Sequence, residues 1–260
     1  MDSLFSVTDQ VVVVSGASRG IGRAIAQGFA QRGAQVIITG RQLSTLRQTA
    51  DSMRAQGGKV DHAVCDVSQP EDIARLVQQS LKQHGRIDTL VNVAGVNRRK
   101  PALEITEEDY DFVLNINLKG AFLLSQAVGR HMLARGTGSQ INVASLNTDR
   151  PLKHVAPYAM SKSAMGHMTR ALALEWGPGG VRVNAIAPGF ILTDLTEKLW
   201  SDEAMQAWGK ANTPQRRLGR PEDMVGTAIF LASQASAFMT GQVLYVDGGF
   251  TAGWAWPIPG

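Results

Sequence analysis

Cysteine is nearly absent from this sequence: Cys65 is the only one in 260 residues. A single cysteine excludes an internal disulfide and is typical of proteins kept in a reducing compartment. The first ten residues carry acids and lack the basic segment of a signal peptide, and the valine run at 11–14 is far too short to cross a bilayer. We therefore expect a soluble, cytoplasmic protein that does not contact a membrane.

A strong excess of charge of either sign is also missing. The 26 lysines and arginines stand against 22 acidic residues, a net charge of +4 that is spread along the chain. So mild a balance excludes nucleic acid as the main partner, and we expect a small-molecule substrate instead. Two basic clusters, at 98–100 and 216–217, fit either solvated loops or binding sites.

Spacing typical of metal ligands is absent as well. The five histidines stand at positions 62, 84, 131, 154 and 167, without the short, regular separations that metal sites use. We expect no metal.

What the sequence does contain is a regular alternation of short apolar runs and longer amphipathic segments. We expect strands at 11–14, 35–39, 87–94, 136–145, 182–187 and 242–246, and one that ends at 64–66. Helices are expected to start at 70, 106, 157 and 221. Such alternation predicts right-handed crossovers and a parallel sheet covered on both faces. No linker interrupts it, so the predicted fold is a single α/β domain over 1–260, a doubly wound parallel sheet of about seven strands of the Rossmann type.

A glycine-rich turn follows the first strand. Gly16, Gly20 and Gly22 are spaced G-x-x-x-G-x-G, and a helical pattern begins at once. Strand, glycine-rich turn and helix form the geometry that binds a pyrophosphate, because glycines let the backbone approach and the helix N-terminus supplies free N–H groups. The alternative is a tight turn without a ligand, against which the flanking strand and helix argue.

Further polar or small residues stand where the predicted strands end. Arg41 follows the second strand, Asp66 the third and Ser145 the fifth, while residues 92–95 end the fourth and residues 188–189 follow the sixth. In doubly wound sheets, ligands bind beyond the carboxyl ends of the strands, near the point where the strand order reverses. We expect all of these residues to face one crevice with the glycine turn.

Tyr158 and Lys162 stand four residues apart on a predicted helix, so both side chains project from one face. A free tyrosine, with a pKa of about 10, is a poor base at neutral pH, and a nearby ammonium group lowers that pKa. A bare Tyr-x-x-x-Lys is usually an ordinary helix. Ser145, at the ligand edge, favours proton exchange with an alcohol or a ketone, because its hydroxyl could hold the substrate oxygen. Asn117 lies mid-helix, where asparagine is a mediocre helix former.

These four residues and the glycine pattern resemble the classical short-chain dehydrogenase/reductase family over essentially the whole chain. The glycine loop reads Ser15-Gly16-Ala17-Ser18-Arg19-Gly20-Ile21-Gly22, and the family's Asn-Asn-Ala-Gly stretch reads Asn92-Val93-Ala94-Gly95. By this resemblance the catalytic residues are Asn117, Ser145, Tyr158 and Lys162. The resemblance assigns the following residues to the cofactor: Gly16, Ser18, Arg19, Gly20, Ile21, Gly22, Arg41, Asp66, Val67, Asn92, Ala94, Gly95, Tyr158, Lys162, Pro188, Gly189, Ile191 and Thr193.

The resemblance implies hydride transfer between a nicotinamide and a secondary alcohol or ketone. Tyr158 would give or take the proton, and Ser145 would hydrogen-bond the reacting oxygen. Lys162 would lower the tyrosine pKa and bind the nicotinamide ribose. Asn117 would hold a water that relays protons through Lys162.

The charge after the second strand bears on which nicotinamide dinucleotide is used. An NAD enzyme usually has an acid there to bond the ribose 2′-hydroxyl, but this position is Gly40, followed by Arg41. Arg19 adds a second guanidinium, and two guanidiniums suit a 2′-phosphate. We expect NADP(H), with NAD(H) as the alternative if Arg41 only stacks on the adenine.

The predicted substrate side is polar. We expect the substrate to contact Ser145, Asn147, His154, Tyr158 and Arg98. Such walls suit a polyhydroxylated or anionic molecule better than a steroid or a long acyl chain. The pattern is most similar to the branch of gluconate 5-dehydrogenases and other sugar-acid and polyol dehydrogenases. The alternative is a 3-oxoacyl-[acyl-carrier-protein] reductase. A non-catalytic nucleotide sensor is a further alternative, but the presence of all four predicted catalytic residues argues against it.

Two segments near the C-terminus are predicted to serve access and assembly. Residues 192–212 indicate a small polar helical lid over the substrate, with Trp200 and Trp208 exposed. The tail at 251–260 is apolar and uncharged, and on a monomer it would form an exposed apolar patch. Since members of the family are commonly homotetramers, we expect a homo-oligomer, a tetramer, whose tail packs on a neighbour. The alternative is a tail that folds back on its own subunit.

Overall fold

The computed structural model describes residues 3–253, in which seven parallel strands form one sheet in the order β3-β2-β1-β4-β5-β6-β7. The strands are β1 (Val11–Ser15), β2 (Gln35–Gly40), β3 (Lys59–Val64), β4 (Thr89–Asn92), β5 (Gly138–Val143), β6 (Val181–Pro188) and β7 (Val243–Val246). The order reverses between β1 and β4, which is where such sheets bind their ligands. The predicted doubly wound, Rossmann-type sheet is confirmed.

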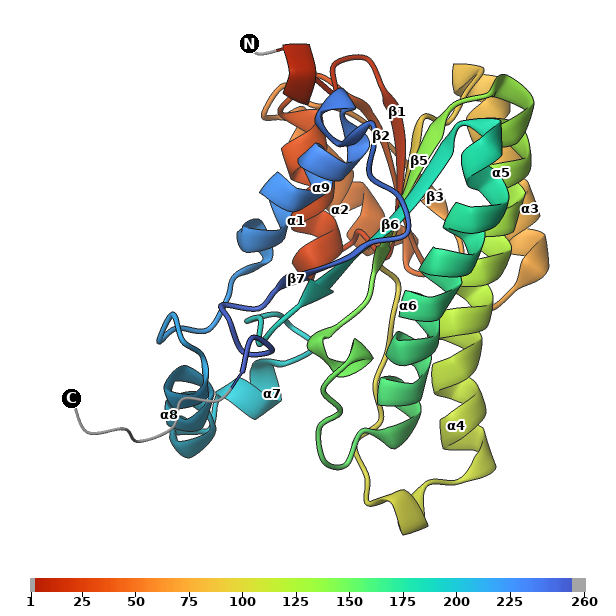
Figure 1. Ribbon diagram of the computed structural model, residues 1–260. Coiled ribbons are helices and arrows are strands. Elements are labelled where there is room, and N and C mark those ends of the chain that lie inside the picture. The colour runs from red at the N-terminus through yellow and green to blue at the C-terminus, as the bar shows by residue number, and fades with distance from the viewer. Residues whose placement is uncertain (1–2, 254–260) are drawn as a thin grey trace.

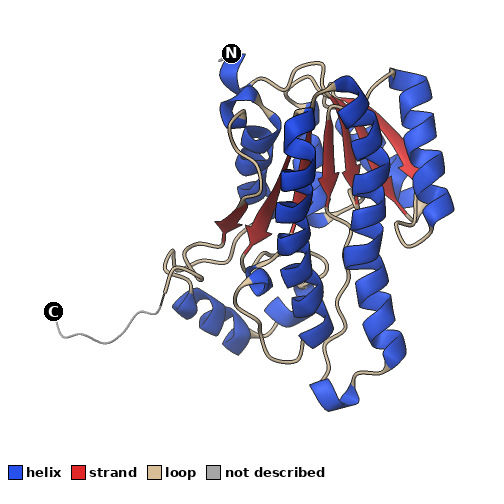
Figure 2. Ribbon diagram, turned by 45° about the vertical axis from the view of Figure 1, so that its right-hand side comes forward, coloured by secondary structure: helices blue, strands red, loops and turns tan. Residues whose placement is uncertain are grey.

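Helices cover both faces of the sheet (Figures 1 and 2). One face carries α1 (Gly20–Ala30), α2 (Leu43–Arg54) and α9 (Val225–Ala232), and the other carries α3 (Pro70–His84), α5 (Ala121–Arg135) and α6 (Ala156–Trp176). Val12 and Val14 of β1 pack in the first core, whereas Val11 and Val13 pack in the second. Both faces of β1 are therefore buried, which explains its unbroken run of valines. Within residues 3–253 no helix is long and apolar enough to cross a bilayer.

The helix predicted from position 106 is interrupted. Thr106 caps α4 (Glu107–Leu114), its hydroxyl accepting the backbone N–H of Asp109 at 3.2 Å, and a π-helical turn, Asn115–Gly120, joins α4 to α5. Turns of this kind are frequent at functional sites, because the wider backbone re-aims a side chain. Here the side chain is Asn117. The helix predicted from 221 likewise opens as a 3₁₀ turn, Pro221–Met224, before α9 begins.

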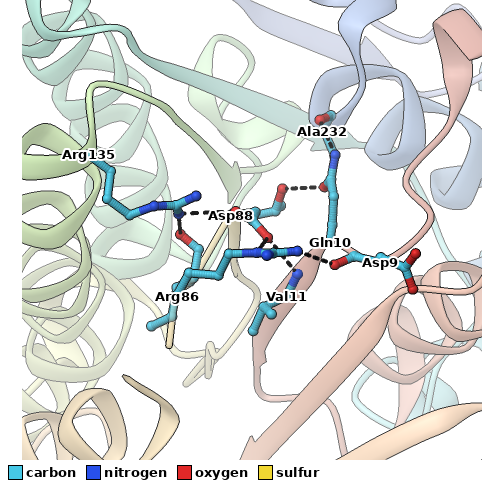
Figure 3. Close-up of polar contacts among 9 residues, drawn as sticks. Asp9, Gln10, Val11, Arg86, Asp88, Arg135 and Ala232 are labelled. Atoms are coloured by element: carbon cyan, nitrogen blue, oxygen red, sulfur yellow. Dashed lines mark hydrogen bonds and ion pairs between the residues drawn. The ribbon is translucent and has the colours of Figure 1, made fainter. Parts of the chain in front are cut away.

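A polar network joins the elements at the amino end of the sheet (Figure 3). Asp88, just before β4, accepts hydrogen bonds from the backbone N–H of Val11 at 2.8 Å, from Arg86 Nε at 2.8 Å and from Arg135 Nη1 at 3.0 Å. One carboxylate thus links the first residue of β1 to the last residue of α5. This edge is opposite the glycine turn, so we assign the network to holding the sheet together.

Residues 192–212 contain two short helices, α7 (Glu197–Trp200) and α8 (Glu203–Asn212), which lie beyond the carboxyl end of β6 (Figure 1). The prediction that both tryptophans are exposed is wrong for Trp200, which is 4% exposed, whereas Trp208 is 43% exposed. The ring of Trp200 packs edge-on against that of Phe190, with centroids 5.4 Å apart, and it also lies against Gly209 of α8, where an added Cβ would be 3.1 Å from the ring. The inner side of this segment is therefore apolar.

Candidate active site

A cleft lies at the carboxyl ends of the first four strands. Most residues predicted for the cofactor line it: Gly16, Ser18, Arg19, Gly20, Ile21, Gly22, Arg41, Asp66, Val67, Ala94, Gly95 and Thr193. Other lining residues are not among those predicted from the sequence, for example Val96, Ile116, Val143 and Asp194. These residues share only their position, because each follows or faces the end of a strand. The order of the strands in the sheet is what brings them to one cleft.

The glycine turn fits a pyrophosphate. No side chain caps α1 at Arg19, so the N–H groups of the first turn are left for an anion. Gly16 has φ +66, and a Cβ added there would lie 2.7 Å from the Cα of Ala94. At Gly22 an added Cβ would lie 2.4 Å from the carbonyl oxygen of Gly16. A larger residue at either position would force the loop open, so the close approach of backbone to phosphate requires glycine.

Positive charge stands in this cleft beside the end of β2. Gly40 ends β2, so no acid occupies that strand end, and Arg41 follows it. Arg19 Nε lies 3.9 Å from Asp194 Oδ2, and both side chains are more than half exposed. Such an exposed pair contributes little, so Arg19 is available to a phosphate.

Six of the predicted cofactor residues do not line the cleft: Asn92, Tyr158, Lys162, Pro188, Gly189 and Ile191. Asn92 is buried in β4, where its amide donates to Asn142 Oδ1 at 3.0 Å and to Ser125 Oγ at 2.9 Å. Pro188 ends β6, and the two residues Gly189 and Ile191 line a second cavity. Asn92 therefore supports the cleft indirectly, because its hydrogen bonds hold the central strands together.

The four predicted catalytic residues stand close to the boundary between the cleft and the second cavity. Ser145 and Tyr158 line the second cavity. Lys162 Nζ donates to the carbonyl oxygen of Val143, a cleft residue, at 2.7 Å. Asn117 bonds both backbone groups of Val96, its Oδ1 accepting at 2.8 Å and its Nδ2 donating at 2.9 Å.

Gly95 connects two of these side chains. A Cβ added at Gly95 would lie 3.4 Å from Asn117 Oδ1 and 3.7 Å from Lys162 Nζ, so both side chains reach the loop after β4. The structure brings the tyrosine, the serine and the lysine together from two elements, the loop after β5 and α6. These side chains can place a proton donor, Tyr158, and a hydrogen-bond donor, Ser145, against one oxygen atom of a bound molecule.

Burial shifts the pKa values of the two titratable members in opposite directions. It raises the pKa of Tyr158, an effect that the hydrogen bond to Ser145 and the positive charge of Arg99 partly offset. It lowers the pKa of Lys162 to about 8. Both shifts have one cause: removing a group from water disfavours its charged form.

The second cavity, of about 500 Å³, lies within the range of ordinary small-molecule sites, roughly 300–1,000 Å³. One wall is polar, with Asn97, Arg99, Asn147, Lys153 and His154 beside the serine and tyrosine. Of the two adjacent arginines in the basic cluster, Arg99 lines the cavity and the predicted Arg98 does not. Arg98 pairs with Asp109 instead. Composition alone could not decide between adjacent arginines.

The same cavity also has an apolar wall, which was not predicted. It consists of Phe190, Leu195, Leu199, Trp200, Met205 and Trp208. Phe190 also packs on Trp208, with centroids 5.6 Å apart. The spacing of the leucines and tryptophans in 195–208 is the signal that could have revealed this wall, because short amphipathic helices put them on one face.

Comparison with known proteins gives matches over nearly the whole chain. The sequence model of the enoyl-(acyl carrier protein) reductase family matches residues 16–251. Gluconate 5-dehydrogenase of Gluconobacter oxydans (strain 621H) is 40% identical over 248 residues, 95% of this chain and 97% of that protein. The 5-keto-D-gluconate 5-reductase of Escherichia coli (strain K12) is 37% identical over 249 residues, 96% of this chain and 98% of that one.

A solved structure agrees with these relatives. The gluconate 5-dehydrogenase of Burkholderia cenocepacia J2315, in complex with NADP and tartrate, superposes with a TM-score of 0.94 at 36% identity, covering 97% of this chain and 99% of that chain. Fold and matches together define an oxidoreductase of the Rossmann type that acts on CH–OH groups. The chain belongs to the short-chain dehydrogenase/reductase family.

Proposed function

We propose that this protein catalyses the NADP(H)-dependent interconversion of a secondary alcohol and a ketone on a sugar acid or a polyol. The observation that carries the proposal is the joint position of Ser145 and Tyr158 on a cavity that adjoins the glycine-turn cleft. The gluconate 5-dehydrogenase and the 5-keto-D-gluconate 5-reductase among its relatives support the substrate class.

In this proposal each of the four residues has one task. When bound, the nicotinamide supplies or accepts the hydride at the reacting carbon. Tyr158 gives the oxygen a proton in reduction and takes it in oxidation, and Ser145 hydrogen-bonds the same oxygen as charge develops on it. Lys162 binds the ribose hydroxyls and passes protons onward. Asn117 fixes the loop after β4 and holds the water that completes the relay.

The preference for NADP(H) rests on charge. Arg41 and Arg19 would bind the 2′-phosphate, and Gly40 leaves the strand end without the acid that would repel it. NADP in the Burkholderia cenocepacia enzyme supports this assignment. NAD(H) is the alternative, which applies if Arg41 stacks on the adenine.

The substrate assignment rests on the polar wall. Arg99 and Lys153 stand on the same cavity as Tyr158, so they would hold a carboxylate while Asn147 and His154 bond hydroxyl groups. His154 has φ +66, a conformation that is uncommon outside glycine and concentrates at ligand sites. The aromatic wall can pack against the carbon face of the same molecule.

That apolar wall also favours a second candidate, the reduction of a 3-oxoacyl thioester, whose acyl chain would lie against Leu195, Leu199 and Trp208. Initial rates separate the two. We expect NADPH oxidation with 5-keto-D-gluconate and NADP⁺ reduction with D-gluconate to exceed the rates with acetoacetyl-coenzyme A. Faster turnover of the thioester would establish the second candidate, and binding of NADPH without turnover of any ketone would indicate a nucleotide sensor.

We also propose a homo-oligomer. β7 is an edge strand that pairs only with β6 among the described strands, and it carries the 37% exposed Tyr245. Phe238, just before it, is fully exposed. An unprotected edge next to exposed aromatic side chains suits pairing with a second copy of the chain. The predicted contact with a neighbour concerns the tail at 251–260, of which residues 254–260 lie outside the described part of the chain.

A further inference from the structure

The loop that follows β4 alternates in its contacts. Asn97 and Arg99 line the substrate cavity, whereas Arg98 and Lys100 both form ion pairs with Asp109. In an extended segment, successive side chains point to opposite sides. The two sides of this segment therefore have different partners, the cavity on one and a single carboxylate on the other.

Asp109 is placed to hold that alternation. It lies in the first turn of α4 and is 2% exposed, with Oδ1 accepting from Arg98 and Oδ2 from Lys100. The same carboxylate completes a capping box, accepting the backbone N–H of Thr106 at 3.4 Å. The two cations hold its pKa well below the usual range of an aspartate. Its position is thus set by the helix, and the loop is fastened to it at two points.

Two further contacts keep the loop in register. The guanidinium of Arg98 lies over the ring of Phe112, 4.3 Å from its centroid. The backbone N–H of Lys100 donates to the carbonyl oxygen of His154 at 3.1 Å, which joins this loop to the other rim of the cavity. A shift of the loop by one residue would break all of these contacts and would move Arg98 to the cavity in place of Arg99.

We propose that Asp109 is a positioning residue, which presents Arg99 to the substrate by holding Arg98 and Lys100 on the far side of the loop. The proposal rests on the function proposed above, because Arg99 is taken to hold an anionic group of the substrate. Asp109 itself does not line the cavity, so its whole effect on the reaction passes through the loop.

The test is a double-mutant cycle of Asp109→Asn and Arg99→Met, since residues that act through one another give non-additive effects. Asparagine keeps an acceptor for the Thr106 cap and removes the charge. Two quantities are measured: KM and kcat for 5-keto-D-gluconate with saturating NADPH, and the pKa of Tyr158 from phenolate absorbance without substrate. The chain has three tyrosines, and the Tyr158→Phe variant identifies which step belongs to Tyr158.

We expect Asp109→Asn to raise KM about tenfold, because a charge-assisted contact to the substrate is lost, and to change kcat much less. It should raise the pKa of Tyr158 as Arg99→Met does, because the arginine's charge lowers that pKa while Ser145 continues to bond the phenol. Lys162, 5.8 Å from the ring centre, and the cavity residues Lys153 and His154 are unchanged in every variant. In the Arg99→Met background, Asp109→Asn should change neither quantity further.

Additive effects of the two substitutions, or an unchanged KM and Tyr158 pKa in folded Asp109→Asn protein, would overturn the proposal. Asp111→Asn, an exposed acid on the same helix, is the matched control and should resemble the unsubstituted protein. If Asp109→Asn does not fold, Lys100→Met replaces it in the cycle with the same expected signs. If the unsubstituted protein reduces no ketone, the proposed function fails, and the phenolate titrations alone decide whether Asp109 positions Arg99.

Discussion

The Lys162 ammonium nitrogen lies 5.8 Å from the centre of the Tyr158 ring and is bonded to the carbonyl oxygen of Val143. The sequence analysis expected this lysine to lower the tyrosine pKa. In the structure the net shift is upward, because burial dominates, and the groups that oppose it are Ser145 and Arg99. The lysine is held by the backbone carbonyl of Val143, a cleft residue, so its proposed role toward a ribose can be tested separately from its role toward the phenol.

Removing the phenol oxygen should separate binding from chemistry. Tyr158→Phe keeps the ring and its packing, so NADPH affinity from fluorescence titration should be unchanged, while kcat should fall by at least about a hundredfold with the loss of general acid catalysis. Tyr110→Phe, an exposed tyrosine on α4, is the control and should keep full activity. Retention of more than about a tenth of kcat by Tyr158→Phe would remove the tyrosine from the proton step.

The buried lysine should make stability depend on pH. Its pKa is about 8 when folded against 10.5 for a free lysine, so between these values the unfolded chain binds more protons and stability rises with pH. The full rise is at most on the order of 3 kcal/mol. We expect urea unfolding at pH 7.5 and 10 to show a smaller rise in Lys162→Met than in the unsubstituted protein. Lys82→Met, on the exposed side of α3, should keep the full rise.

Cofactor choice should depend on Arg41. Arg41→Ala should weaken NADPH binding by roughly 1.5–3 kcal/mol, about 10- to 150-fold, and leave NADH binding nearly unchanged, because only NADPH has the 2′-phosphate. Fluorescence titration with both nucleotides measures the difference. The control is Arg47→Ala, an exposed arginine of α2 outside the cleft. An equal loss for both nucleotides would indicate stacking on the adenine and would return NAD(H) to consideration.

The segment at 192–212 should behave as a lid. Its inner side carries Trp200 and Leu199 against the cavity, and its outer side carries exposed residues. Closure over bound ligands excludes water and slows local opening. Hydrogen exchange in 192–212 should be fast in the free protein and slower with NADPH and 5-keto-D-gluconate together. The β1 strand provides the internal reference, and identical exchange of the lid in both states would argue against it.

Assembly should depend on the edge of the sheet. Light scattering of the full chain should give a tetramer, and Tyr245→Lys, which places a charge on β7, should reduce its size. Leu43→Lys, on the exposed side of α2 away from β7, is the matched control and should leave the mass unchanged. A full-length monomer would refute the oligomer. Truncation after position 251 tests the tail, and unaltered mass and activity would show that it serves neither assembly nor catalysis.

The sequence by itself determined the architecture and the position of the site. Val11–Ser15 is buried on both faces, and its first four residues are valines, a run of apolar β-branched side chains that is visible without a structure. Gly22 has to be glycine because an added Cβ would lie 2.4 Å from the carbonyl oxygen of Gly16. Gly16 has to be glycine because an added Cβ would lie 2.7 Å from the Cα of Ala94, just after β4. Signals of this kind depend on local conformation and on the period of the side chains, so they can be read along the chain.

Only the tertiary structure decided which residues line the second cavity. Arg98 and Arg99 are chemically identical neighbours, and the choice between them depends on Asp109, which comes from a different element. Trp200 and Trp208 both pack on Phe190, but the ring of Trp200, on α7, also lies against Gly209 of α8, and nothing in α7 alone shows that contact. Each of these outcomes depends on a contact between separate elements. Hydrophobic periodicity and local propensity describe one element at a time, and they do not contain that information.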